Sequence, residues 1–193
     1  MLLSIDTSTG TSLALVALDG RVLREASLDD SMRHAEAIGP LLAELELPRS
    51  ELTGVVVGVG PGPFTGLRVG IAAARAFAWG ASLPLLPLVS HDAAALSAAD
   101  SGVGRAVIVT DARRREFFQT DYRIDEFGIP RREAGPRIVT EPNGELVRFI
   151  RAANLGRVAA AKLARAEAYD PPTAVYLRSP DVTLASAPKR VSG

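Results

Sequence analysis

The sequence contains no cysteine and only two histidines among its 193 residues. The absence of cysteine excludes disulfide bonds, thiolate catalysis and cysteine-ligated zinc sites, and it fits a cytoplasmic protein. The histidines are His34 and His91, and neither has a second histidine one helical turn away, so no zinc pair is predicted. We expect His91, which follows Ser90, to begin a helix. The histidine content therefore argues against a metallopeptidase.

An excess of one charge and a long apolar run are also lacking. The chain has 22 basic and 22 acidic residues, so it has no general basic character of the kind that nucleic-acid-binding proteins show. No apolar run approaches the length that a membrane-spanning helix needs. Hydrophobic residues make up 47%, enough for a core, and the length allows one medium domain or two small ones.

A glycine- and proline-rich stretch, residues 58–70, is the most distinctive part of the chain. It lies between Val55–Val57, a β-branched run typical of a buried strand, and Ile71–Ala81, which favours a helix. Such strand-to-helix turns often bind phosphate. Here the Gly-Lys-Ser/Thr ending of a P-loop is absent, and Pro61 and Pro63 remove two N–H donors. We favour a structural role for this turn over nucleotide binding.

The first hundred residues predict a regular order of strands and helices. An Asp19-Gly20 hairpin signal joins the second and third strands. The predicted strands are 2–9, 12–18, 22–28, 52–59 and 85–89, and the predicted helices are 31–47, 65–81 and 91–99. The order βββαβαβα is that of a ribonuclease-H-like half-domain, which also builds the actin, sugar kinase and Hsp70 ATPases. We therefore predict an α/β fold of that class, with residues 1–100 as the N-terminal domain.

A short linker at Ser101–Gly104 precedes a second unit, which we predict to be a smaller C-terminal α/β domain over residues 105–193. It is expected to contain strands at 106–111 and 116–125, helices at 145–153 and 158–168, and an irregular tail from Ala174. The two strands are joined by Arg113–Arg115. This run is compatible with binding phosphate or RNA, but we favour a solvated turn that is paired with Glu116.

The helix predicted at 65–81 is apolar nearly all round. Arg68, Arg75 and Trp79 are its exceptions, and their spacing places them on one face. The helix either lies buried between the sheet and the helix at 31–47, or uses its spare face to pack against another protein, where Arg and Trp are frequent anchors. The residues alone leave both interpretations open.

Asp6 ends the first strand and is followed by Thr7 and Ser8. A two-metal nuclease needs further carboxylates on neighbouring strands. The strand at 52–59 has none, so nuclease activity is not expected. The Asp6-Thr7-Ser8 cluster is able to meet a metal-bound phosphate. We favour the simpler role, in which it satisfies backbone groups at the end of the strand.

Five motifs, in matching order along nearly the whole chain, carry a resemblance to a known family. They are residues 3–9, His34-Ala35-Glu36, residues 58–70, Asp111-Ala112-Arg113 and Val175–Arg178. Together they resemble the TsaB (YeaZ) family of the tRNA threonylcarbamoyladenosine pathway. The run 60–68 is the most specific element. Pro63 departs from the family, which usually has serine there, and this further weakens nucleotide binding.

The resemblance implies a two-domain actin/Hsp70-like fold and a degenerate relative of TsaD, the subunit that transfers threonylcarbamoyl onto N6 of adenosine 37. It implies a non-catalytic scaffold in the cytoplasm that binds TsaD through its N-terminal helices, is joined by the ATPase TsaE, forms a homodimer when alone and meets tRNA only through the complex. No metal or cofactor is implied. ATP binding is doubtful.

Ten residues on the two N-terminal helices are the partner contacts that we expect on this basis: Met32, Ile38, Leu42, Leu45, Arg68, Ala72, Ala73, Arg75, Phe77 and Trp79. Asp6, Thr7 and Ser8 are the expected remnant of a nucleotide site, and no catalytic residue is assigned. The alternative is an ATP-binding enzyme of the same fold, either an ATPase or a phosphotransferase.

Overall fold

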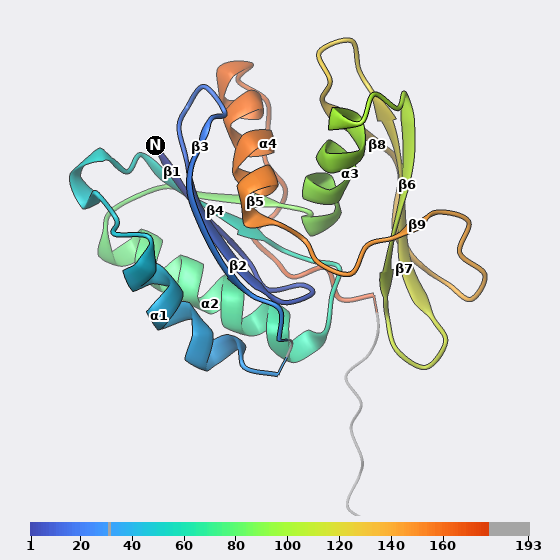
Figure 1. Ribbon diagram of the computed structural model, residues 1–193, viewed down its shortest axis with the longest axis horizontal. Coiled ribbons are helices and arrows are strands. Elements are labelled where there is room, and N and C mark those ends of the chain that lie inside the picture. Colours follow the sequence, from blue (N-terminus) through green and yellow to red (C-terminus); the bar gives the residue numbers. More distant parts are fainter. Residues whose placement is uncertain (31, 178–193) are drawn as a thin grey trace, which may run out of the picture.

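The computed structural model describes residues 1–30 and 32–177, so Ser31, the predicted helix start, and Arg178, the end of the last family motif, lie outside the described residues. The chain forms two β-sheets with helices on both faces of the first (Figure 1). Among the helices in these ranges, none combines the length and the apolar character needed to cross a membrane.

The first sheet begins with the antiparallel meander that the sequence predicts. Strands β1 (Leu2–Asp6), β2 (Thr11–Val16) and β3 (Val22–Leu28) pair in sequence, and the turn at Asp19-Gly20 places Gly20 at φ 86°. Strands β4 (Gly54–Gly58) and β5 (Leu85–Leu88) then add in parallel beside β1, giving the order β3-β2-β1-β4-β5. The predicted order βββαβαβα is confirmed, and its last element is helix α3 (Ser90–Asp100).

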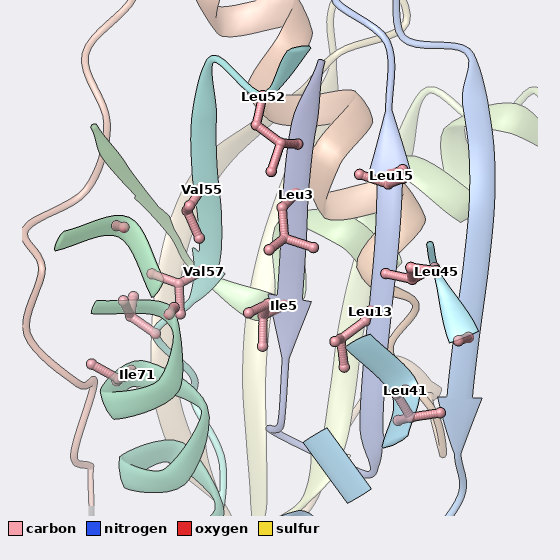
Figure 2. Packing of buried hydrophobic residues seen from close by; sticks show 14 of the residues in the cluster. Leu3, Ile5, Leu13, Leu15, Leu41, Leu45, Leu52, Val55, Val57 and Ile71 are labelled. Carbon is pink, nitrogen blue, oxygen red and sulfur yellow. The ribbon is translucent and has the colours of Figure 1, made fainter. Parts of the chain in front are cut away.

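Helices cover both faces of this sheet. Helices α1 (His34–Glu44) and α2 (Phe64–Gly80) lie on one face, with the 3-10 turn η1 (Arg49–Glu51) after α1, whereas α4 (Ala152–Ala164) lies on the other. Alternation along the strands separates the two cores. Side chains that face α1 and α2 form the larger core of Figure 2, which includes Leu3, Ile5, Leu13, Leu15, Val55 and Val57. Their neighbours Leu2 and Val56 pack in a second core with residues of α3 and α4.

The second sheet contains β6 (Arg105–Asp111), β7 (Phe117–Ile124), β8 (Pro130–Val139) and β9 (Glu145–Leu146), in the order β8-β7-β6-β9. Helix α3 (Ser90–Asp100) lies between the two sheets (Figure 1). Strand β8 is absent from the sequence prediction. The predicted helix at 145–153 is wrong, because the chain there forms β9 and an irregular connection before α4.

Helix α4 begins at Ala152, well before the predicted start at residue 158. It packs on β1 and β2 of the first sheet, although it follows the predicted linker. A Cβ on Gly156 would lie 2.5 Å from Val16 Cγ2, so this glycine permits the close approach of helix and strand. The division into domains at 1–100 and 105–193 stays a prediction, and α4 connects the two parts.

Candidate functional site

The polar residues at the end of β1, Asp6, Thr7 and Ser8, form hydrogen bonds with each other and with nearby backbone groups. Asp6 is 1% exposed, and its Oδ1 accepts hydrogen bonds from the Ser8 backbone N (2.9 Å) and the Ser8 Oγ (2.6 Å). Burial raises the pKa of the Asp6 carboxyl, against the opposing effect of these hydrogen bonds. Thr7 Oγ1 donates to the Gly66 carbonyl at 2.8 Å. Thr7 therefore joins the end of β1 to the first turn of α2, while Asp6 and Ser8 bond to each other.

The glycines of the turn allow this junction to close. A Cβ on Gly58 would lie 1.8 Å from Asp6 Oδ2, and one on Gly70 would lie 2.1 Å from Thr7 Oγ1. At Gly62 the added atom would lie 2.7 Å from the Ser8 carbonyl oxygen. These contacts support the structural role that we favour for residues 58–70. Nucleotide binding by Asp6, Thr7 and Ser8 stays a prediction.

The two histidines are buried in separate places. His34 Nδ1 lies 2.9 Å from Thr11 Oγ1. His91 is in the first turn of α3, as predicted, and its ring lies between Thr120 Oγ1 (2.8 Å) and Thr110 Oγ1 (2.9 Å). Burial lowers the pKa of His91 to about 3, so the ring is neutral near pH 7. In residues 1–30 and 32–177, no group of three histidine or carboxylate side chains is placed to hold a metal ion.

A set of polar and charged side chains around the buried Asp92 links α3 to the second sheet. Tyr122 Oη donates to Asp92 Oδ1 at 2.7 Å, and Arg132 forms ion pairs with Asp92 (3.2 Å) and Asp170 (2.5 Å). Burial raises the pKa of Asp92 to about 6, although the Arg132 charge opposes that shift. Sequence reasoning missed this set because Arg132 lies on the strand that it did not predict. We assign it a structural role, since it ties α3 and residue 170 to β7 and β8.

Helix α2 presents an exposed face that agrees with the sequence prediction. Arg68, Ala72, Arg75 and Trp79 are all exposed, with Trp79 at 87%. Met32 precedes α1 and is 85% exposed. Three further predicted contacts are only partly exposed: Leu42, Ala73 and Phe77. Of these, Leu42 and Phe77 also pack against the larger core.

The structure corrects two of the predicted partner contacts. Ile38 is 7% exposed and Leu45 is 1% exposed, so neither belongs to a free surface. Leu45 lies in the larger core together with Ala37 and Leu41. Ile38 lies on the face of α1 that is buried with Ala37 and Leu41, and Leu45 follows the last residue of the helix.

The C-terminal part of the described chain lies along α2. Val175 N donates to the Val59 carbonyl at 2.8 Å. Arg68 Nε donates to Tyr176 Oη at 3.1 Å, and its guanidinium lies 3.6 Å from the centroid of the Phe64 ring. Arg75 donates to the Pro172 carbonyl. Both basic side chains of the exposed face are therefore held by residues 172–176, a feature that the sequence did not reveal.

A cleft of about 550 Å³ opens between the end of the first sheet and the turn that joins β6 to β7. We call it the inter-sheet cleft, and its lining includes Ser8, Thr9, Asp29, Asp111, Arg113, Phe117 and Arg148. Ser8 belongs to the predicted remnant of a nucleotide site, and Thr9 is the next residue. Arg113 belongs to the arginine run. The cleft therefore brings together two motifs that the sequence analysis treated separately.

Comparison with known proteins identifies the family. The sequence model of the TsaD family, described as tRNA N6-adenosine threonylcarbamoyltransferase, matches residues 19–185 of this chain. The chain belongs to the TsaD family. Within it, the chain is TsaB/YeaZ-like: it is 31% identical over 133 residues to the tRNA threonylcarbamoyladenosine biosynthesis protein TsaB of Escherichia coli K12, across 66% of this chain and 57% of TsaB. An uncharacterized Mycobacterium leprae protein is 41% identical over 146 residues, across 72% of this chain and 38% of that protein.

The TsaB-like chain thus spans less than two thirds of the length of these curated relatives. A solved structure, YeaZ from Pseudomonas aeruginosa, matches with a TM-score of 0.78 at 23% identity, covering 91% of this chain and 99% of that one. This likeness concerns the fold. It confirms the predicted actin/Hsp70-like α/β fold. The matches to E. coli TsaB and to the TsaD family confirm the resemblance to the TsaB (YeaZ) family.

Proposed function

We propose that this chain is a non-catalytic subunit of the machinery that makes N6-threonylcarbamoyladenosine at position 37 of tRNA. In this role its α2 face binds a TsaD protein, TsaE joins the pair, and a homodimer forms when TsaD is absent. Similarity to E. coli TsaB supports involvement in threonylcarbamoyladenosine biosynthesis. The binding role rests on the exposed face of α2.

The observation that carries the proposal is the composition of this face. Trp79 is 87% exposed at the end of a helix whose other exposed positions include Ala72, Arg68 and Arg75. Tryptophan and arginine dominate the binding energy of many interfaces, and small residues between them let a second helix approach closely. Because Arg68 and Arg75 are already held by residues 172–176, little side-chain entropy remains to be lost when a partner binds.

The non-catalytic part of the proposal is supported by the state of the polar residues. Asp6, Thr7 and Ser8 are bound to backbone groups or to one another. Each histidine is buried beside threonine hydroxyls, where it has no access to a substrate. A general acid or base must reach the reacting group within hydrogen-bond distance. Asp6 Oδ2 has no hydrogen-bond partner among the described residues, but it is buried.

The experiment is light scattering on the chain alone and mixed with TsaD from the same source. We expect a homodimer that is replaced by a mixed complex. Ala72→Glu should abolish both assemblies without changing the unfolding midpoint, because it places an unpaired charge in the contact. Ala164→Glu, at an exposed alanine of α4 on the other side of the sheet, is the matched control. Assembly that survives Ala72→Glu contradicts the proposal.

The inter-sheet cleft favours a second candidate, an ATP-binding enzyme of the same fold, because Ser8 and Thr9 line it. Calorimetric titration with ATP and magnesium separates the two. Saturable heat that Asp6→Ala removes, together with a monomer that ignores TsaD, would favour the enzyme.

A further inference from the structure

Most arginines around the second sheet have carboxylate partners. Arg132 pairs with Asp92 and Asp170, Arg137 Nη2 lies 2.7 Å from Asp121 Oδ2, and Arg157 Nη1 lies 2.6 Å from Asp100 Oδ2. Three further arginines differ: within residues 1–30 and 32–177, the side chains of Arg113, Arg115 and Arg148 have no such partner. Two of these three, Arg113 and Arg148, line the inter-sheet cleft.

The arginine turn has an unusual backbone. Arg113, Arg114 and Arg115 all adopt positive φ, at 68°, 55° and 62°. Each such residue costs on the order of 1 kcal/mol when it is not glycine. The turn is held by Asp111 Oδ1, which accepts from the Arg113 backbone N at 2.7 Å, and by the Glu116 N, which donates to the Arg113 carbonyl at 3.0 Å. The fold thus stabilises a strained conformation that leaves all three side chains exposed at the end of the second sheet.

The cleft beside this turn combines positive charge with an aromatic ring. Phe117, the first residue of β7, lines the cleft and is half-buried. The hydroxyl residues Ser8 and Thr9 form part of the opposite wall, at the end of β1. Cationic side chains that follow a backbone, with aromatic rings for stacking, are the pattern of single-stranded nucleic-acid sites.

A nucleotide held by its phosphates alone has little support here. The backbone of Gly62 packs against Ser8, and Pro61 and Pro63 carry no N–H, so the glycine-rich turn offers few donors for a phosphate cradle. The cations come instead from two separate segments, the β6–β7 turn and residue 148. This arrangement suits several phosphates along a chain better than one compact group.

We infer that the inter-sheet cleft binds a single-stranded segment of RNA directly, with backbone phosphates on Arg113, Arg115 and Arg148 and a base against Phe117. The choice of RNA over other polyanions rests on the proposed function. The existence of an anion-binding site in the cleft rests on the arrangement of its side chains and does not depend on that proposal. Asp29 also lines the cleft, and its carboxylate repels phosphate. Asp111 lines the cleft as well, but its carboxylate holds the arginine turn. Asp29 is therefore the acidic residue that a substitution can remove without disturbing that turn.

The test is fluorescence anisotropy of a short labelled single-stranded RNA with the full chain over a series of salt concentrations. Arg113→Ala and Arg148→Ala should each weaken binding roughly fivefold at low salt and reduce the salt dependence by about one phosphate contact. Phe117→Leu should weaken binding with no change in the salt dependence, since stacking releases no ion. Asp29→Asn should strengthen binding. Arg21→Ala, at an exposed arginine of the β2–β3 turn, is the control and should have no effect.

Three results would overturn the inference: no RNA binding at low salt, binding that the arginine variants leave unchanged, or binding that adenosine monophosphate or inorganic phosphate displaces completely at equal concentration. Equal affinity for duplex RNA would reject the single-stranded form of the site. Light scattering with TsaD is run on the same variants and should be unchanged. Failure of RNA binding with intact docking rejects this inference alone, whereas failure of docking rejects the proposed function.

Discussion

At the scale of single residues, the junction of β1, β4 and α2 depends on positions where no side chain fits. Gly58 ends β4 beside the buried carboxylate of Asp6 and the hydroxyl of Ser90. The Ser90 hydroxyl also accepts from the Gly60 backbone N at 3.1 Å. A methyl group at Gly58 would displace a buried polar network rather than a flexible side chain.

Gly58→Ala is therefore expected to lower the free energy of unfolding by about 3 kcal/mol, because overpacking would also disturb buried hydrogen bonds. Urea unfolding followed by circular dichroism measures this change. The control is Gly39→Ala in α1, where an added Cβ meets nothing within 4 Å. It should raise stability by about 0.5–1 kcal/mol through helix propensity. If the two substitutions changed the free energy of unfolding equally, the close contact at Gly58 would not contribute to stability as proposed.

The sequence predicts some of these residue roles and not others. The proline positions and the missing P-loop lysine indicate a structural turn, and the contacts of Gly58, Gly62 and Gly70 support that interpretation. The carboxylate of Asp92 gives no such signal. Its partners Tyr122 and Arg132 lie thirty or more residues along the chain, and only the folded sheet brings them together.

At the scale of elements, α4 is attached to the first hairpin by side chains. Ser12 Oγ accepts from the Ala152 backbone N, and Thr9 Oγ1 accepts from the Ile150 N, each at 2.9 Å. The first N–H groups of a helix have no partner within the helix. Here β2 and the loop before it supply acceptors for the start of α4, across about 140 residues of sequence.

Ser12→Ala should lower the free energy of unfolding by about 1 kcal/mol, the usual effect of removing a side-chain acceptor at a helix N-terminus. Thermal or urea unfolding measures it. The matched control is Ser27→Ala on β3, where the serine is exposed and the change should stay within about 0.5 kcal/mol. A loss at Ser27 as large as at Ser12 would contradict the capping role.

The elements that the sequence missed share a physical cause. Strand β8 contains Pro130, Gly135 and Pro136 among charged residues, a composition typical of loops, and it forms an edge strand where such residues are tolerated. Gly156 falls between the two predicted helices at 145–153 and 158–168, yet it lies inside α4, where Val16 leaves no space for a side chain. Hydrophobic periodicity does not report these long-range contacts. The regular N-terminal order was predictable because its strands and helices follow local patterns.

At the scale of the whole molecule, the first sheet is completed by parts from both ends of the chain. One face of β1 and β2 is covered by α1 and α2, which follow within the first half. On the other face, Ala14 and Val16 pack on Ala152 and Ala153 of α4. Residues 1–100 alone would leave this second apolar face uncovered.

We therefore expect a fragment of residues 1–100 to lack cooperative unfolding and to bind the dye ANS, whereas residues 1–177 should unfold in one transition. The comparison uses urea titration at equal protein concentration. An exposed sheet face of this kind favours association or loose packing over a stable fold. Cooperative unfolding of the shorter fragment would show that α4 is not required and would support the predicted domain boundary.

The late position of α4 also has a consequence during translation. A ribosome adds about 5–20 residues per second, so Ala152 emerges roughly 7–27 seconds after Val16. Throughout that interval the nascent chain carries a sheet face whose covering helix has not been made. The position of α4 late in the sequence thus sets how long chaperones have to engage the growing polypeptide.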